Sequence, residues 1–300
     1  DGIQSVPRGT LLGVLCFALF ACAFNLLIGY VGLLSFGHAA FFGMAGYVAG
    51  HAAKEWGLTP ELAVLAGTAA AALLGLAFGA LAIRRQGIYF AMITLAFAQM
   101  VYFFCIQAPF THGEDGLQGI VRKPLLGGLI PTKDDRVLYY VVLAIFLFGY
   151  GAIYRFIHSP FGQVLKAIRD NEQRALSLGY EADRYKLLAF VLSAALAGLA
   201  GATKALVLQF ATLTDVSAAM SGEVVLMALV GGLGTIIGPV IGAFVIITMQ
   251  NYLAASGEFV LVIQGVIFVV IVMAFRKGVV GEFSEWWRRR RAPGAAKAAD

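Results

Sequence analysis

Charged side chains are scarce in this sequence: Asp, Glu, Lys and Arg together make up 13% of its 300 residues. Soluble globular domains carry about 25% charged residues, so the composition excludes an ordinary soluble domain. Hydrophobic residues instead reach 60%, and the mean hydropathy is +0.83. Several apolar runs approach or exceed the roughly 20 residues that a spanning helix needs. The sequence therefore predicts an integral membrane protein that contacts membrane lipid.

Cysteine is also rare, and the motifs of common enzyme and metal sites are missing. The three cysteines lie in apolar runs without a CxxC pair, which favours packing residues over disulfides or metal ligands. The four histidines are far apart in the sequence, and none has the spacing of a metal site, so we expect no bound metal. No GxxxxGK[ST] or HExxH motif occurs, so we expect no catalytic residues and no ATP hydrolysis by this chain. No basic patch interleaved with exposed aromatics is present, so no nucleic-acid partner is expected.

Apolar runs of spanning length recur along the chain. They predict membrane helices at about 10–28, 62–83, 88–108, 137–157, 187–208 and 259–275. Together with two interrupted segments, they predict an all-α polytopic helical bundle of about eight to nine transmembrane segments. We expect residues 1–278 to form a single transmembrane domain with a loop at 109–136. A basic tail follows at 279–300.

Glycine is abundant in two apolar segments, 29–50 and 223–254. The first contains six glycines in 22 residues, and an interior glycine costs a helix up to about 1 kcal/mol. A regular lipid-facing helix is therefore unfavourable in this segment. A broken or tightly packed helix beside a transport path is the better interpretation.

Basic residues are unevenly distributed between the connections. The segments 84–85, 155–186 and 276–277 together hold ten Lys and Arg residues, whereas the connections on the other side hold six, mixed with acidic residues. The positive-inside rule places the richer side and the C-terminus in the cytoplasm. This orientation requires 223–254 to enter the membrane and return, as two short helices or a re-entrant pair turning near 232–239. The two Gly-rich segments then run in opposite directions, as expected for an inverted repeat around a central pathway.

A polar segment with helical order, 159–179, interrupts the apolar sequence. Pro160 fits the first turn of a helix capped by Ser159, and Gly179 lies where a helix would end. Apolar residues recur at three- and four-residue steps, and charged residues occupy the other face. The apolar face comprises Phe161, Val164, Leu165, Ile168, Ala175 and Leu176. Such a helix lies either on the membrane surface or in a groove on a partner protein.

Three motifs carry a resemblance to a known family. The first is Glu172, Ala175 and Gly179 followed by YKLLAF at 185–190. The second is SFGHAAFFG at 35–43, preceded by NLLIGY at 25–30, and the third is EVVLM at 223–227 with GGLGTIIGP at 231–239. In this order they resemble LivM-type permease subunits of the branched-chain amino acid ABC importer family, from about residue 25 to 278.

The resemblance implies that 159–179 is a coupling helix that docks on a cytoplasmic ATPase. We expect the coupling residues to be Phe161, Gly162, Arg169, Asn171, Glu172, Ala175 and Gly179. The implied partners are a second, LivH-type permease subunit, two ATPase subunits and a periplasmic substrate-binding protein near the 109–136 loop. This chain would bind no cofactor itself, because ATP and Mg belong to the ATPases. The expected location is the bacterial inner membrane, with several passes, and relatives have a further N-terminal span.

Candidates for the substrate path come from the Gly-rich motifs and one charged residue. They are Asn25, Ser35, Gly37, His38, Lys204, Glu223, Gly232 and Gly234. His38 is either a substrate contact or a packing histidine bonded to a backbone carbonyl, and the second is favoured. Lys204 either extends to the outer interface, which is favoured, or attracts a carboxylate-bearing substrate. Glu223 is expected to cap a short helix rather than contact substrate.

Two other function classes compete with the importer. An ion-coupled secondary transporter built on an inverted repeat normally needs an ionisable residue in mid-membrane. A passive channel needs a filter, and none is recognisable. Within the importer class, the resemblance leaves the substrate open among branched-chain amino acids, urea, amides and carboxylates.

Overall fold

The computed structural model describes residues 8–120, 123–124, 134–253, 260–274, 278 and 280–282. These residues are predominantly helical, and five of the helices are long and apolar enough to cross a membrane. They span Thr10–Val31, Pro60–Ala82, Ile88–Gln107, Arg136–Ile157 and Ala182–Leu208. The predicted polytopic helical bundle is therefore confirmed. The predicted tail at 279–300 lies outside the described residues apart from 280–282, as does much of the 109–136 loop.

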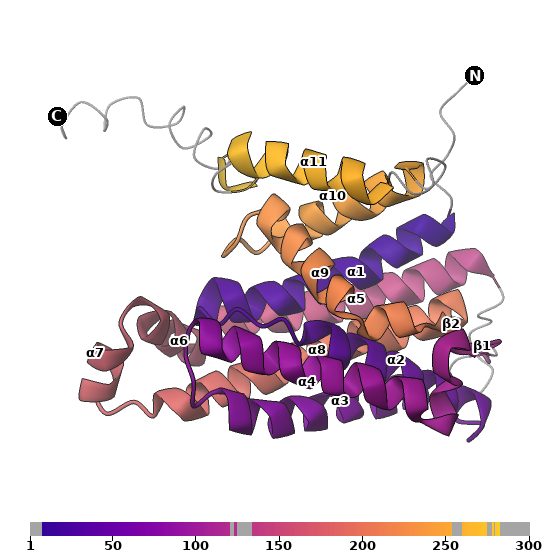
Figure 1. The fold of residues 1–300 in the computed structure, drawn as a ribbon, viewed down its shortest axis with the longest axis horizontal. Coiled ribbons are helices and arrows are strands. Elements are labelled where there is room, and N and C mark those ends of the chain that lie inside the picture. Colours follow the sequence, from indigo (N-terminus) through magenta and orange to yellow (C-terminus); the bar gives the residue numbers. More distant parts are fainter. Residues whose placement is uncertain are drawn as a thin grey trace.

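The helices follow the predicted apolar runs closely (Figure 1). In chain order they are α1 (Arg8–Asn25), the π-helix η1 (Leu26–Val31), α2 (His38–Lys54), α3 (Pro60–Ala82), α4 (Ile88–Gln107), α5 (Asp135–Ile157), α6 (Pro160–Asp170), α7 (Glu172–Ser177), α8 (Ala182–Leu208), α9 (Ala218–Gly231), α10 (Gly238–Leu253) and α11 (Val260–Ala274). Short 3-10 turns lie at η2 (Pro109–Thr111), η3 (Gly113–Asp115) and η5 (Leu213–Val216).

The bundle has two chemically different ends. One, called the α6 end below, holds α6, α7, the α3–α4 connection at 83–87 and the α9–α10 turn at 232–237. The other, called the β1 end, holds a pair of antiparallel strands, β1 (Leu117–Gln118) and β2 (Phe210–Ala211). Leu117 pairs with Ala211 and Gln118 with Phe210, so the segment after α4 is tied to the segment after α8.

Helices α2, α3 and α8 pack closely at the centre because small residues line their contacts. A Cβ atom at Gly67 of α3 would lie 2.5 Å from the Ala45 carbonyl oxygen of α2. A Cβ atom at Gly201 of α8 would clash with the Phe42 carbonyl oxygen. Close approach of backbones through small residues is the usual packing mode of membrane helices. Helix α8 therefore packs against both α2 and α3.

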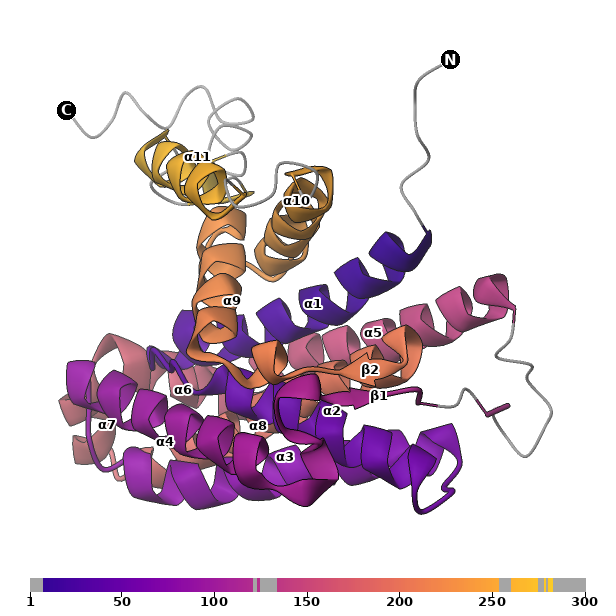
Figure 2. The ribbon, with the colours of Figure 1, turned by 45° about the vertical axis from the view of Figure 1, so that its right-hand side comes forward.

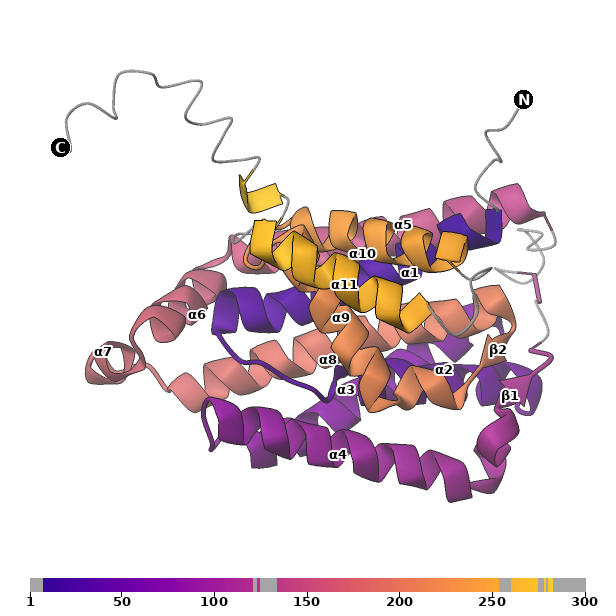
Figure 3. The ribbon, with the colours of Figure 1, turned by 45° about the horizontal axis from the view of Figure 1, so that its top comes forward.

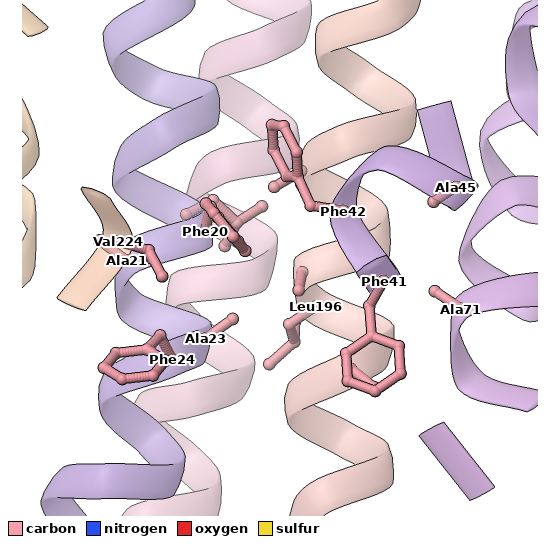
Figure 4. Packing of buried hydrophobic residues seen from close by; sticks show 14 of the residues in the cluster. Phe20, Ala21, Ala23, Phe24, Phe41, Phe42, Ala45, Ala71, Leu196 and Val224 are labelled. Atoms are coloured by element: carbon pink, nitrogen blue, oxygen red, sulfur yellow. The ribbon is translucent and has the colours of Figure 1, made fainter. Parts of the chain in front are cut away.

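Aromatic side chains fill the space between α1, α2 and α8. Phe20, Phe24, Phe41 and Phe42 are fully buried, and they gather with Leu196 in one cluster (Figure 4). The rings of Phe20 and Phe42 stack with centroids 4.4 Å apart. Such pairs contribute about 0.5–1.5 kcal/mol beyond their burial. The cluster fixes α2 against α1.

The first Gly-rich segment is broken, as predicted. Helix α1 continues into η1, which ends at Gly32 with a φ of 80°. Residues 32–37 are non-helical, and α2 then begins at His38. The segment lies in the packed interior rather than at the lipid surface, since most of its residues are buried.

The second Gly-rich segment forms two short helices, which confirms the predicted pair with a turn near 232–239. Helix α9 leaves the central bundle and leads to α10 and α11 (Figure 2). A Cβ atom at Gly231 would clash with the Gly238 carbonyl oxygen, and one at Gly242 with the Met227 carbonyl oxygen. The two helices therefore pack as a closely crossed pair. The inverted-repeat relationship to 29–50 stays a prediction.

We predict that Gly201→Ala lowers the free energy of unfolding by about 1–3 kcal/mol, because the added methyl group has no space beside Phe42. Gly151→Ala in α5 is the matched control, since nothing lies within 4 Å of its Cβ position. It should be neutral or stabilise the helix by up to about 1 kcal/mol. Thermal unfolding in detergent measures both. Equal midpoints for the two variants would contradict the packing described above.

Candidate functional site

Helix α6 starts with a capped first turn packed on the end of α5. Ser159 Oγ accepts a hydrogen bond from the Gly162 amide at 3.3 Å, and Pro160 follows the cap. A Cβ atom at Gly162 would clash with the Ile157 carbonyl oxygen, so glycine is required there. The ring of Phe161 packs beside it, against α5 and α8. The start of the segment 159–179 is thus fixed to α5 and α8.

The segment 159–179 is two helices rather than the one predicted. Asn171 has an extended backbone, with φ −159° and ψ 98°, and this ends α6. Its Oδ1 accepts a hydrogen bond from the Arg174 amide at 3.0 Å and caps α7. Asparagine is among the strongest N-cap residues, which explains the break. Gly179, with a φ of 88°, follows the end of α7, as predicted.

Glu172 is held by two groups of its own chain. Lys186 Nζ lies 2.6 Å from its Oε1, and Gln86 Nε2 donates to its Oε2 at 2.9 Å. Lys186 belongs to α8 and is buried, whereas Gln86 lies in the α3–α4 connection. Glu172 therefore joins three segments at the α6 end. Its carboxylate points into this chain.

Arg169 connects α6 to the broken first segment. Its Nη1 donates to the Gly29 carbonyl oxygen of η1 at 2.5 Å. Its Nη2 lies 3.0 Å from Asp170 Oδ1, which fixes the plane of the guanidinium group. A Cβ atom at Gly32 would lie 2.8 Å from Arg169 Cγ, so the side chain crosses directly over that glycine.

The outermost part of the segment is an apolar tip, of which the sequence analysis named Leu176 alone. It comprises Leu176, Leu178 and Tyr180, which are 46%, 70% and 39% exposed. Leu176, predicted on the apolar face that lies on the membrane surface or in a groove of a partner, is exposed in this chain. Ala175 is the buried member of α7. Figures 1 and 3 show α7 farthest from the bundle at the α6 end.

Asn25 holds the turn between α9 and α10. Its Nδ2 donates to the Thr235 carbonyl oxygen at 2.8 Å, and its Oδ1 accepts from the Gly234 amide at 3.0 Å. Gly232 and Gly234 have φ values of 113° and 75°, which other residues rarely adopt. Three predicted path residues therefore build the α9–α10 turn: Gly232 and Gly234 form it, and Asn25 binds its backbone.

The start of α2 is stabilised by buried hydroxyl groups. Ser35 Oγ accepts from the Gly37 amide at 3.2 Å, and Thr94 Oγ1 of α4 accepts from the Phe36 amide at the same distance. A Cβ atom at Gly37 would lie 2.8 Å from the Thr94 carbonyl oxygen. Ser35 and Gly37 therefore stabilise the non-helical segment that precedes α2.

His38 is fully buried at the first position of α2. Its Nε2 lies 2.8 Å from Ser193 Oγ of α8, and this hydroxyl donates in turn to the Ala23 carbonyl oxygen at 2.5 Å. The ring reaches a backbone carbonyl only through Ser193, which differs from the predicted direct bond. Edge-on contacts with Phe24 and Phe41 complete its surroundings and favour a packing role.

Lys204 does not extend to the outer interface, so the favoured prediction is wrong. Its Nζ lies 2.5 and 2.6 Å from the two oxygens of Asp215 in η5. Their side chains are only 7% and 6% exposed. Asp215 also caps its own 3-10 turn through the Thr212 amide at 3.3 Å. The lysine charge is neutralised inside the protein.

Glu223 does not cap α9, which corrects a second prediction. The helix begins at Ala218, and Ser217 Oγ accepts from the Met220 amide at 3.4 Å as its cap. Glu223 is half-buried in the second turn and interacts with Gln250 of α10. It therefore links the two helices of the second Gly-rich segment.

The predicted path residues lie outside the apolar groove found among the described residues. An apolar groove of about 300 Å³ lies between α1, α5 and α10, and none of the path candidates lines it. The described residues also contain no group of three His, Cys, Asp or Glu side chains that could hold a metal ion. The candidate residues instead bind backbone groups at the helix breaks, and Arg169 connects α6 to η1.

Interrupted helices packed at the centre of an apolar bundle, with an amphipathic segment projecting from one end, define a polytopic membrane transport protein. A sequence model of the family described as "Branched-chain amino acid transport system / permease component" matches residues 8–272. The chain belongs to this family. It is a family of transport permeases and not a class of enzymes.

Individual relatives agree with the family match. The chain is 25% identical to the high-affinity branched-chain amino acid transport system permease protein LivM of Escherichia coli K12, over 92% of this chain and 71% of the relative. It is 26% identical to LivM of Salmonella typhimurium, over 88% and 67%. The ribose import permease protein RbsC of Bacillus subtilis is 31% identical over 54% of this chain and 50% of its own length. No solved structure matches.

We predict that Lys204→Met lowers the free energy of unfolding by about 3–5 kcal/mol, because Asp215 then remains buried without its cation. The double variant Lys204→Met, Asp215→Asn should recover most of this loss, since no buried charge is left over. Thermal unfolding in detergent compares the three proteins. A single variant as stable as the original chain would disprove the buried pair.

Proposed function

We propose that this chain is a membrane-spanning subunit of an ATP-driven importer for branched-chain or other hydrophobic amino acids in a bacterial inner membrane. The family match and the printed function of the LivM relatives support the substrate class. The structural observation that carries the proposal is the projecting α6–α7 segment with its exposed apolar tip. In an importer this segment receives force from an ATPase subunit.

The distribution of charge supports a cytoplasmic α6 end. Among the described residues this end holds eight basic side chains, whereas the β1 end holds five. The eight are Arg84, Arg85, Arg155, Lys166, Arg169, Arg174, Arg184 and Lys186, and the five are Arg8, Lys54, Lys123, Arg136 and Lys204. The positive-inside rule favours this orientation, with the C-terminus inside. The β1 end then faces a substrate-binding protein outside.

The tip of Leu176, Leu178 and Tyr180 fits an apolar groove on an ATPase subunit. Exposed apolar side chains on a short helix, surrounded by charges, are typical of a helix-in-groove contact. Two ATPase subunits, using ATP and Mg, would supply the energy. The second of them would contact the equivalent segment of a second, LivH-type permease subunit.

The buried charges argue against an ion-coupled secondary transporter. Such a transporter normally needs an ionisable group in the membrane that can change its partner. Among the described residues, the buried lysines Lys186 and Lys204 are both held in ion pairs that fix connecting segments. Glu223 interacts with Gln250 between two helices. Each of these groups is already bound to a partner that links two segments of the chain, which does not favour a role in ion coupling.

The test of the function is uptake by vesicles containing this chain, its partner permease and the ATPases. The binding protein is supplied outside with branched-chain amino acids, urea, short amides or carboxylates. We expect uptake of branched-chain amino acids that requires ATP. Uptake driven by an ion gradient without ATP would replace the importer with the secondary transporter, and uptake of another solute would correct the substrate.

We predict that Leu178→Ala weakens ATPase binding roughly 10- to 100-fold, because a central apolar contact contributes about 1.5–3 kcal/mol. Leu62→Ala removes a comparable side chain, 50% exposed, at the opposite end of the bundle and should leave binding unchanged. Binding of purified ATPase to the permease pair in nanodiscs measures both. Equal affinities for the two variants would exclude the tip as the docking element.

A further inference from the structure

We propose that Gly29, in the π-helix η1, is the junction through which a displacement of α6 reaches the α9–α10 turn. This inference rests on the proposed function, because it takes α6–α7 as the segment that an ATPase moves. The structure places α6 against one side of Gly29 and the α9–α10 turn against another. The three segments are far apart in the sequence and meet at this residue.

The first contact is the hydrogen bond from Arg169 to the Gly29 carbonyl oxygen, at 2.5 Å. Carbonyl groups in the last turn of a helix lack intrahelical partners, and Gly29 lies in the last turn of η1. Arg169 therefore supplies a charged donor to a carbonyl oxygen that lacks an intrahelical partner. Charge-assisted bonds of this kind are about twice as strong as neutral ones.

A second contact strengthens the attachment of α6 to η1. Lys166 Nζ lies 5.7 Å from the centre of the Tyr30 ring, within the range of a cation–π interaction. Arg169 crosses over Gly32, the residue that ends η1. Helix α6 thus contacts η1 and the residue that follows it at three positions, Gly29, Tyr30 and Gly32. A movement of α6 that leaves η1 behind would break all of these contacts.

The opposite side of Gly29 lies directly on the α9–α10 turn. A Cβ atom at Gly29 would lie 2.8 Å from the Gly234 amide nitrogen and 2.7 Å from Asn25 Oδ1. Asn25 is the residue that binds both Gly234 and Thr235 of the turn. With no side chain between them, the two backbones touch, and displacement of one displaces the other.

The turn can pass this movement on to both of its helices. Helices α9 and α10 cross with backbone contacts at Gly231 and Gly242, so they shift together. π-Helical turns often occur at functional sites, and η1 joins the anchored helix α1 to the non-helical segment 32–37. We therefore assign the transmission of movement to Arg169, Gly29 and Asn25 as positioning residues.

Distance measurements between spin labels test this assignment in the complete transporter. The native cysteines Cys16, Cys22 and Cys105 are all buried, so exposed cysteines introduced elsewhere are labelled selectively. The label pairs are Gln163→Cys with Thr214→Cys, reporting on α6, and Ile237→Cys with Thr214→Cys, reporting on the turn. All three positions are exposed. Binding of a non-hydrolysed ATP analogue should shift both distances.

Arg169→Gln should keep the shift at α6 and abolish the shift at the turn. Uptake per ATP hydrolysed should fall about tenfold or more, because one charge-assisted bond is lost. The Arg169 side chain is 40% exposed, so this variant should fold. Asn25→Leu, which breaks the relay on its other side, should give the same pattern. If the two substitutions acted only by distorting the structure, both label distances would change instead.

Arg184→Gln is the matched control. It removes the same charge from an exposed arginine paired with Glu181 and should leave both shifts intact. Retention of the turn shift and of coupled uptake in Arg169→Gln would overturn the relay while leaving the proposed function standing. No shift at α6 in the unsubstituted chain would overturn the proposed function and the relay together.

Discussion

The structure depends on one constraint: inside a membrane, every backbone amide and carbonyl group needs a partner from the protein itself. Helices α1 and α2 are separated by a break in the interior, and this break exposes such groups. Buried side chains satisfy them, with Ser35, Thr94 and Ser221 accepting from amides near the start of α2. Asn25 does the same for the α9–α10 turn. The polar residues of the interior are therefore placed where helices stop.

Helix α8 organises the charges in a similar way at both ends of the bundle. It carries one buried lysine near its start and another near its end, Lys186 and Lys204. Lys186 binds Glu172 of α7, and Lys204 binds Asp215 of the segment that precedes α9. Breaking a buried pair costs about 3–5 kcal/mol, so both connections are firmly anchored. The same helix thus fixes the start of α7 and the connection that leads into the second Gly-rich pair.

Much of the fold could be predicted from apolar run length, glycine clusters and charge distribution. The failures concern contacts that depend on three-dimensional register. The Asn171 break follows a cap signal that was present in the sequence, and it divides the single helix predicted at 159–179 into α6 and α7. Asp215 lies eleven residues beyond Lys204 across a change of direction, so helical spacing did not reveal the pair. The bond from Arg169 to Gly29 joins residues 140 apart and has no local signal.

The uneven packing of the bundle suits a division between a rigid and a movable part. Helices α2, α3 and α8 are in backbone contact, and closely packed interiors resist deformation. Helix α10 instead borders the apolar groove of about 300 Å³, with Val240, Ile241 and Phe244 on its wall. Because this space lies beside α10, a displacement of the α9–α10 turn need not compress the aromatic cluster between α1 and α2. In the relay proposed above, the second Gly-rich pair is the part that moves, and α8 with its two ion pairs is the frame against which it moves.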